Sequence, residues 1–392
     1  MKSGEQITAE QIEDSGPYPV YGGNGLRGYA NAFTHDGYFA LIGRQGALCG
    51  SINYAEGKFW ASEHAVVVSP RLPCNVLWLG EFLRTMNLGQ YSITAAQPGL
   101  SVEVIGNLRV PVPPAVEQSA IAAFLDRETG KIDALVAEQE RLIALLKEKR
   151  QAVISQAVTK GLDPNAPMKD SGVPWLGQVP AHWDVYAVST LTTKITNGYV
   201  GPTRDILVDD GIRYLQSLHI KNNRISFHVP YYVTAEWSAI HEKSVLSSGD
   251  VLIVQTGDIG QTAVVTDEFS GCNCHALIIL TPDRRRLSGD WLSWVLNSTY
   301  GQHTLLSIQT SALHPHLNCG DVKSVRVPMP PLAEQIRIIS DIEHNLAMIE
   351  RLEAEATRAI TLLRERRAAL ISAAVTGKID VRNEVPDAQE AA

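Results

Sequence analysis

The sequence predicts an α+β protein in which two small α/β domains are separated by two long helices. The helices are expected to pair as an antiparallel coiled coil with pseudo-two-fold symmetry. Three observations lead to this prediction. A 54-residue segment occurs twice, both copies have the apolar spacing of a long helix, and the sequences ahead of the two copies share a faint pattern.

The repeat comprises residues 110–163 and 327–380. The two copies align without a gap at an offset of 217, and 24 of the 54 aligned positions are identical. Each copy begins with Val-Pro-x-Pro-Pro, and proline lacks the backbone N–H that sheets and helix interiors use. We therefore expect this run neither to continue a sheet ladder nor to lie inside a helix, so that it marks the start of each long helix.

After the proline run, apolar residues recur in alternating steps of four and three over about five heptads. A helix of about 45 residues spans roughly 65–70 Å. Gly130 predicts a kink or break near the middle of the first copy. The residues expected at the interface of the helix pair are Leu125, Ile132, Leu135, Leu142, Leu146 and Val153 in the first copy, and Ile342, Ile349, Leu352, Leu363 and Leu370 in the second.

The partner predicted for each helix is the other copy. A two-fold axis reverses the direction of the helix it copies, so the two helices would run antiparallel and bury each other's apolar seam. Two alternatives remain open at this point. Each helix could pack only on its own globular neighbour, or it could mediate homodimerisation.

Composition limits the class of protein. The chain has 392 residues, enough for two or three domains, and a formal net charge of −8. This charge argues against a free-standing nucleic-acid binder, but it allows local contacts or positive charge supplied by partners. Five cysteines without a framework spacing suggest the reducing cytoplasm. Neither a signal peptide nor a membrane span is expected, because no apolar run is long enough.

The globular domains are predicted from short strands and turn signals. Residues 1–108 form the first domain, and its expected strands and helix cover residues 18–21, 38–43, 51–54, 65–69 and 76–86. Residues 164–325 form a linker rich in turn residues and a second domain, with a strand at 249–254 and a helix at 291–300. Residues 109–163 and 326–380 are the two repeat helices, and the acidic tail 381–392 is expected to be disordered.

A weak echo links the two domains. In each, a glycine opens a strand, a second glycine ends it, and a histidine follows eighteen residues later, His64 in the first domain and His275 in the second. The side chains between these positions differ almost completely. This pattern suggests one scaffold that carries two different surfaces.

No catalytic constellation is evident. The run Gly23–Gly28 matches G-x-G-x-x-G, but the residues after it are poor helix formers, so a close-approach Gly-rich loop is favoured over a dinucleotide site. Metal binding is a minor alternative at two places, and buried thiols and a turn are the default interpretation. The two places are Cys272, Cys274 and His275, and His303, His314, His316 and Cys319.

The motifs resemble one family. Each repeat contains Pro-x-Pro-Pro, Glu-Gln, Leu-Leu-x-Glu-x-Arg and Ile-Ser-x-Ala-Val-Thr, and the linker contains Val-Pro-Trp-Leu-Gly and His182-Trp183. Together they are similar to the specificity (S) subunits of type I restriction–modification systems over nearly the whole chain. The order of parts is also the family's: target-recognition domain, central helix, second target-recognition domain, distal helix.

This resemblance implies a protein without enzymatic activity. Each recognition domain would read one half of a bipartite site in double-stranded DNA, and the helix pair would set the spacer between the halves. Two methyltransferase subunits, which use S-adenosylmethionine, would dock on the helices, and restriction subunits that translocate with ATP and Mg²⁺ would join them. One departure is that the first domain has no counterpart to the strand expected after Trp183, so it looks short at its N-terminus.

Base edges are read by Arg, Lys, Asn, Gln and Thr side chains from loops or a helix. Such residues occur here in stretches whose polar side chains no apolar periodicity explains, although an ordinary turn role is an equal alternative for each. A packing role is expected for His64 and His275. The candidates are Asn24, Arg27, Arg44 and Gln45 in the first domain, and Gln216, Lys221, Asn222, Asn223, Gln255 and Thr256 in the second.

Two rival functions remain. The chain could be a coiled-coil interaction scaffold whose globular ends bind proteins, or an enzyme that uses the Gly-rich loop for a nucleotide. A salt-dependent gel shift with and without a methyltransferase separates the scaffold from a specificity subunit. A thermal shift with nucleotides tests the enzyme.

Overall fold

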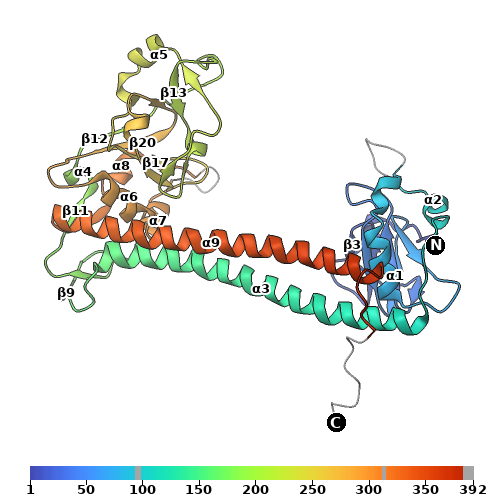
Figure 1. Cartoon of the computed structure of the whole chain (residues 1–392). Helices are drawn as coiled ribbons and strands as arrows, with labels where there is room; N and C mark the ends of the chain where they lie inside the picture. Colours follow the sequence, from blue (N-terminus) through green and yellow to red (C-terminus); the bar gives the residue numbers. More distant parts are fainter. Residues whose placement is uncertain (93–98, 311–314, 383–392) are drawn as a thin grey trace. The chain divides into compact units, whose positions relative to one another are not determined.

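The computed structural model describes residues 1–92, 99–310 and 315–382. The chain divides into two compact units (Figure 1). Unit 1 comprises residues 1–141 and 356–392, and unit 2 comprises residues 142–355. Both long helices cross this division, so each unit contains one half of each helix together with one globular part. In the described residues, no helix is both long and apolar enough to cross a membrane.

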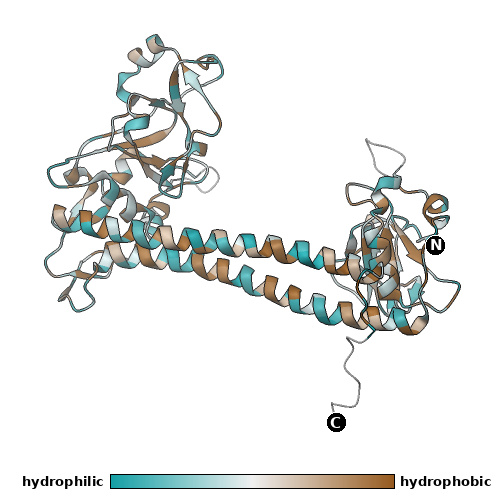
Figure 2. Ribbon diagram, viewed as in Figure 1, coloured by the Kyte–Doolittle hydropathy of each residue, from teal (hydrophilic) through white to brown (hydrophobic). Residues whose placement is uncertain are grey.

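The two repeat copies form the long helices α3 (Ala115–Lys160) and α9 (Leu332–Val375), of 46 and 44 residues. Apolar and polar residues alternate along both (Figure 2). Helix α3 is continuous through Gly130, so the helix is not broken there. One glycine costs about 1 kcal/mol in a helix interior. The flanking turn offsets part of that cost, since Glu128 bonds both Arg127 and Lys131.

The helix halves pair antiparallel inside each unit. In unit 1, Arg367 bonds Asp133 at 2.8 and 3.2 Å, and one turn towards the N-terminus of α9, Arg364 bonds Glu140 at 3.0 Å. In unit 2, Arg150 bonds Glu350 at 3.1 Å. Arg150 and Arg367 are equivalent in the repeat, and so are Asp133 and Glu350. Each copy therefore provides the acid of one ion pair and the arginine of the other, as a two-fold repeat requires.

The predicted interface is buried only in part. Leu125, Ile132 and Leu146 in α3 and Ile342 and Ile349 in α9 are buried. The second-copy residues Leu363 and Leu370 and the first-copy residue Val153 are half-buried.

Three predicted interface residues are exposed instead. These residues, Leu135, Leu142 and Leu352, are exposed by 46, 39 and 45%. They lie near the midpoints of α3 and α9, and heptad spacing overestimates their burial.

The globular part of unit 1 has two sheets. The first has the order β1-β8-β5-β6, with β1 (Lys2–Ser3), β8 (Ala65–Val68), β5 (Phe39–Gly43) and β6 (Ile52–Ala55). One face packs against α1 (Val76–Thr85), η2 (Leu88–Tyr91) and α2 (Val102–Gly106). Its other face meets the second sheet, of order β3-β2-β7-β4, with β3 (Gly25–Ala30), β2 (Tyr18–Gly22), β7 (Lys58–Ala61) and β4 (His35–Asp36).

Unit 2 repeats this plan. Its first sheet has the order β12-β20-β17-β18, with β12 (Thr192–Asn197), β20 (Leu277–Pro282), β17 (Val251–Val254) and β18 (Thr262–Val264). Its partners are α6 (Gly289–Asn297) on one face and, on the other, the sheet β16-β13-β19, with β16 (Tyr232–Val233), β13 (Ile212–Leu215) and β19 (Asn273–Cys274). In both units one pair in the second sheet is parallel, β2 with β7 and β13 with β19. The shared scaffold inferred from His64 and His275 is thus present.

Three local predictions need correction. The helix expected at 291–300 is two helices, α6 and α7 (Thr299–Ser307), because the Ser298 hydroxyl accepts a hydrogen bond from Gly301 N–H and caps α7. The tail was expected to be disordered from residue 381, but Val381 is buried against the unit 1 core. Residues 383–392 lie outside the described part.

The third correction concerns the proline run. In unit 2 it does enter a ladder, because β21 (Arg326–Met329) pairs antiparallel with β11 (Asp184–Ala187). Pro328 lies between Val327 and Met329. The N–H groups of these two residues point to one edge of the strand, and the proline nitrogen, which has no N–H, points to the other edge. A Val-Pro-Met alternation therefore retains one bonding edge and loses only the other.

A glutamine in each repeat copy joins the long helix to the globular part. Gln335 is buried; its Oε1 accepts from Ser288 N–H at 3.0 Å, and its Nε2 donates to Arg286 O and Pro330 O at 2.9 Å. Ser288 is the N-cap of α6.

Its repeat equivalent makes the same connection in unit 1. Gln118 is also buried; its Oε1 accepts from the N–H of Asn75, the N-cap of α1, and its Nε2 donates to Pro113 O. The same joint therefore fixes both globular parts to the helices.

We predict that Gln335→Ala lowers the free energy of unfolding by about 1–3 kcal/mol, because it removes the hydrogen-bond partner of the Ser288 N–H and of the Arg286 and Pro330 carbonyls. Chemical denaturation measures the loss. The exposed Gln156→Ala on α3 is the control and is expected to change stability by less than about 0.5 kcal/mol. Equal effects of the two substitutions would contradict this account of the joint.

Candidate nucleic-acid interface

Equivalent loops follow the central strand of the first sheet in each unit. Arg44 and Gln45 follow β5, and Gln255 and Thr256 follow β17. Each pair is succeeded by a glycine with positive φ, 87° at Gly46 and 83° at Gly257. In both loops the first residue accepts a backbone hydrogen bond, from Leu100 N–H at 2.9 Å and from Leu317 N–H at 3.0 Å respectively. The loop backbones match, whereas the side chains they present differ.

In unit 1 the β2–β3 turn lies against this loop. A Cβ on Gly23 would lie within 3.4 Å of the carbonyl oxygens of Gln45 and His64, and a Cβ on Gly43 would overlap the carbonyl of Gly23. The structure thus brings the exposed Asn24 and the exposed Gln45 into adjacent loops. Arg27 is exposed on β3, with its aliphatic stem over Gly22.

Arg44 makes hydrogen bonds within unit 1. Its Nε donates to Leu100 O at 3.3 Å and its guanidinium to Ser3 Oγ at 3.2 Å, while its N–H donates to His64 O at 2.8 Å. These bonds tie the end of β5 to β1 and to the chain before α2. Reading a base would require Arg44 to give up these bonds.

In unit 2 the hairpin of β14 (Ile220–Lys221) and β15 (Arg224–Ile225) carries three candidates, and two of them form its turn. Asn222 and Asn223 have φ of 51° and 62°, a left-handed conformation that asparagine tolerates well. The Asn223 Oδ1 accepts hydrogen bonds from Ser293 Oγ and from Asn297 Nδ2. The Oδ1 atom of Asn223 therefore anchors the hairpin to α6.

The remaining unit 2 candidates divide by exposure. Lys221, Asn222 and Thr256 are exposed, whereas Gln216 and Gln255 are half-buried. The Gln255 Oε1 is buried without a hydrogen-bond partner. The exposed set that fits base-edge contacts is therefore Asn24, Arg27, Gln45, Lys221, Asn222 and Thr256.

A neutral histidine supports the hairpin of unit 2. His219 Nδ1 accepts from Gln216 N–H at 2.8 Å, and Nε2 lies 2.8 Å from Val229 O. This pair of contacts requires the neutral ring with its proton on Nε2. Burial lowers the pKa of His219 below its ordinary value, which favours the same form.

The other motifs of the sequence have structural places. The run Gly23–Gly28 is a hairpin turn and strand β3, so no helix begins there to hold a pyrophosphate. Cys272 and Cys274 are buried, and burial raises the pKa of the Cys272 thiol to about 11. Across the described ranges no group of three His, Cys, Asp or Glu could hold a metal ion. His314 lies outside those ranges.

The echo histidine His64 lies in a turn, and His275 forms an isolated bridge with Tyr199. The His64 carbonyl accepts from Arg44, and the His275 N–H donates to Leu215 O at 2.8 Å. The His275 ring contacts Tyr199 and Tyr214, and burial lowers its pKa. The ring contacts of His275 agree with the packing role expected for it.

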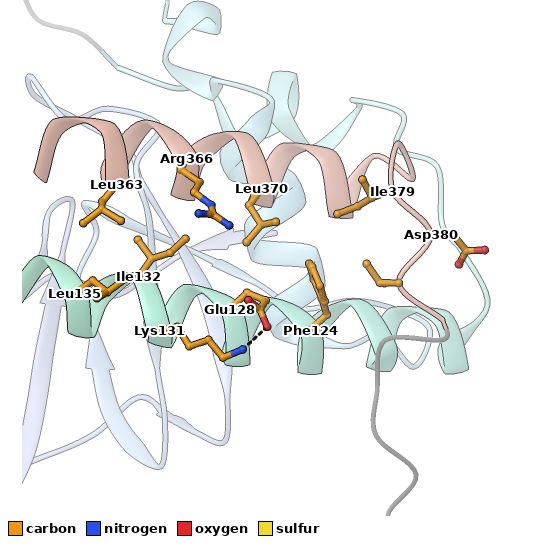
Figure 3. Close-up of a pocket in the computed structure, with 11 residues that line it drawn as sticks. Phe124, Glu128, Lys131, Ile132, Leu135, Leu363, Arg366, Leu370, Ile379 and Asp380 are labelled. Carbon is orange, nitrogen blue, oxygen red and sulfur yellow. Dashed lines mark hydrogen bonds and ion pairs between the residues drawn. The ribbon is translucent and has the colours of Figure 1, made fainter. Parts of the chain in front are cut away.

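A second kind of surface recurs along the helix halves. Unit 1 has a groove of about 480 Å³ between α3, α9 and the segment after α9, with apolar walls that include Phe124, Ile132 and Leu370 (Figure 3). Lys131, which bonds Glu128, and Arg366 also line it.

Unit 2 has a smaller groove, of about 270 Å³, at the equivalent place. It is lined by Asp341 and Asn345 where unit 1 has Phe124 and Glu128. The two grooves therefore share a position in the repeat and differ in polarity.

Heptad reasoning missed a set of exposed leucines. Leu135 and Leu362 in unit 1 are exposed by 46 and 58%, and their repeat equivalents Leu352 and Leu145 in unit 2 by 45 and 51%. Each unit thus presents one such leucine from each helix. The sequence does indicate part of this set. Leu145 and Leu362 are equivalent positions that retain leucine in both copies, although neither belongs to the predicted helix-pair interface.

Comparison with known proteins gives consistent matches. Residues 1–143 match the family model of the type I restriction modification DNA specificity domain. The chain is 47% identical over 131 residues to the EcoprrI specificity subunit of Escherichia coli, covering 32% of this chain and 33% of that protein. It is 25% identical over 319 residues to the Escherichia coli EcoBI specificity subunit, covering 78% and 66%. The matched region is thus less than two thirds of either relative.

A solved structure has the same fold. A chain from a study of complex assembly and conformational transition in a type I restriction–modification system superposes with a TM-score of 0.72 over 97% of this chain and 96% of that chain, at 16% sequence identity. At this identity the likeness supports the architecture of two globular parts and paired long helices.

Proposed function

Since the chain belongs to the type I restriction–modification DNA specificity family, we propose that it reads a bipartite DNA target with one globular part for each half-site. The observation that supports this proposal most directly is the pair of equivalent loops after β5 and β17. The two loops have matching backbone hydrogen bonds but expose Gln45 in one unit and Thr256 in the other. One scaffold with two unlike sets of donors and acceptors suits two unlike half-sites.

The helix pair is proposed to connect the half-site readers. A continuous helix of 46 residues has a fixed rise per residue, so it can hold a constant spacing between two reading heads. The net charge of −8 fits a reader that leaves much of the phosphate contact to its partners. By this proposal the chain is not itself an enzyme, and S-adenosylmethionine, ATP and Mg²⁺ act on partner subunits.

Two methyltransferase subunits are the proposed partners of the helix surfaces. Equivalent exposed leucines on both units offer the same apolar contact twice, which suits two copies of one protein. A scaffold that binds unrelated proteins at its two ends would have no reason to retain both sites. The restriction subunits would join this complex.

We predict that Gln45→Ala and Thr256→Ala each relax sequence preference at only one half-site, by roughly 5- to 150-fold at the contacted base pair. The complex of this chain with its methyltransferase is used to methylate a randomised oligonucleotide library. The methylated sequences give the base preference at both half-sites in one experiment. The exposed Glu10→Ala is the control. Loss of preference at both half-sites from either substitution would contradict the assignment of one unit to each half-site.

A gel shift with the same complex distinguishes a DNA specificity subunit from an interaction scaffold that binds only proteins. DNA binding in a gel shift is expected to weaken steeply with salt and to need the methyltransferase for full affinity. Absence of DNA binding at low salt with the methyltransferase present would favour the scaffold.

We predict that Leu362→Asp and Leu145→Asp each remove one methyltransferase subunit, because a carboxylate placed in an apolar contact is costly to desolvate. Native mass spectrometry counts the subunits, two for the unaltered chain, one for each variant and none for the double variant. Ile336→Asp is the matched control, since Ile336 is 59% exposed but its repeat equivalent is Ser119. Two subunits retained by the double variant would contradict the docking site.

A further inference from the structure

A second segment leaves the first sheet of unit 2 at the same end as the loop after β17. The last residue of β17 pairs with Leu277 and the last residue of β12 pairs with Ile278, and these are the first two residues of β20. The residues that follow β12, 198–200, therefore lie at the end of the sheet that carries the exposed Thr256.

Unit 1 has the same arrangement. Both β1 and β5 end against the first two residues of β8. The residue after β1 is Gly4 and the residue after β12 is Gly198. A Cβ on Gly4 would overlap the carbonyl oxygen of Ala61, and a Cβ on Gly198 would overlap that of Cys274. Because only glycine fits at this place in both units, the segment is part of the shared scaffold.

The position two residues after this glycine is exposed in both units and differs in chemistry. It is Gln6 in unit 1 and Val200 in unit 2, and Val200 is 66% exposed. The loops after β5 and β17 show the same relation, since one exposes Gln45 and the other Thr256. A single exposed valine needs no explanation on its own. A scaffold position that exposes an amide in one unit and an aliphatic group in the other follows the pattern of the reading loops.

Tyr199 fixes the backbone just before Val200. Its N–H and its carbonyl each form a backbone hydrogen bond of 2.9 Å with the segment 274–276. Its ring packs edge-on against Trp237 and His241, with ring centroids 5.1 and 5.0 Å away. A side chain on a backbone held in this way loses little conformational freedom when it makes a contact. Val200 is therefore a preorganised apolar surface.

We propose that Val200 contacts the 5-methyl group of a thymine in the half-site that unit 2 reads. This inference rests on the proposed function. The thymine methyl is the apolar group that base pairs present in the major groove, whereas the amide of Gln6 suits a hydrogen-bonding base edge. The side chain of Val200 has no donor or acceptor, so it would leave the polar edge of any other base without a partner.

The strand spacing limits where this thymine lies. One strand, β20, separates β12 from β17, so the two segments leave the sheet about 10 Å apart. Base pairs follow one another at about 3.4 Å along the duplex. The thymine therefore lies within about three base pairs of the position that Thr256 contacts.

A base analogue tests the contact. The complex of the full chain with its methyltransferase is given its preferred target, and each thymine in turn is replaced by deoxyuridine, which lacks only the 5-methyl group. One replacement is expected to lower kcat/KM for methylation by about fourfold, the factor for burial of one methyl group. This position is expected within about three base pairs of the one that Thr256→Ala relaxes.

The Val200→Ala variant makes the test specific. It is expected to lower kcat/KM on the thymine target and to show no more than about twofold further loss with deoxyuridine, because the contact is already absent. Val208→Ala is the matched control, since Val208 is 37% exposed and precedes β13, whose last residue is the one that bonds His275. This control should retain the full response to deoxyuridine.

Three outcomes would overturn the proposal in a complex that methylates with sequence preference. They are the absence of any thymine whose replacement matters, a deoxyuridine effect that persists in Val200→Ala, and a sensitive thymine that lies farther than about three base pairs from the position relaxed by Thr256→Ala. Methylation without sequence preference is a different result, because it would overturn the proposed function and this inference with it.

Discussion

The antiparallel contact between the two repeat helices is the constraint on which the rest of the structure depends. Asp133 pairs with Arg367 in unit 1, and Glu350, the equivalent of Asp133, pairs with Arg150, the equivalent of Arg367, in unit 2. Partly exposed ion pairs of this kind contribute no more than about 1 kcal/mol each. Their main effect is on register, while the buried aliphatic residues on either side of them provide the stability.

The joints extend this register into the globular parts. Gln118 and Gln335 bond the N-cap residues of α1 and α6 from equivalent positions. A sequence duplicated once therefore specifies both the helix pair and the attachment of each sheet. Substitutions in the loops after β5 and β17 can then change the side chains that each unit exposes without altering the scaffold, which agrees with the proposal of two unlike half-sites.

The sequence predicts the parts that depend on periodicity and on the repeat. The two long helices, their pairing, and the strands β5, β6, β8 and β17 of the first sheet in each unit follow from apolar spacing. Gly130 was expected to break α3, but helix formers on both sides outweigh one glycine. The ladder at Val327–Met329 was missed, because it depends on β11, which lies over 140 residues away in the chain.

The candidate site residues differ in their contacts within the fold. Arg44 and Asn223 are polar loop residues like Gln45 and Asn222, and sequence alone gives no way to separate them. Tertiary contacts decide, since Arg44 reaches Leu100 and Ser3, and Asn223 reaches Ser293 and Asn297. The exposure of Leu135 and Leu352 likewise depends on tertiary structure. Heptad spacing predicts which face of a helix is apolar, but it does not predict how much of that face other parts of the fold cover.

Cross-linking with a short bismaleimide tests the helix register most directly. Cysteines at positions 133 and 367, or at 150 and 350, should be bridged within one chain, as mapped by mass spectrometry of the digested protein. Cysteines at 133 and 350 should not, because Asp133 lies seventeen residues along α3 from Arg150, about 25 Å at the helical rise. Efficient bridging of 133 to 350 within one chain, with the other two pairs unlinked, would mean parallel helices and would contradict the account.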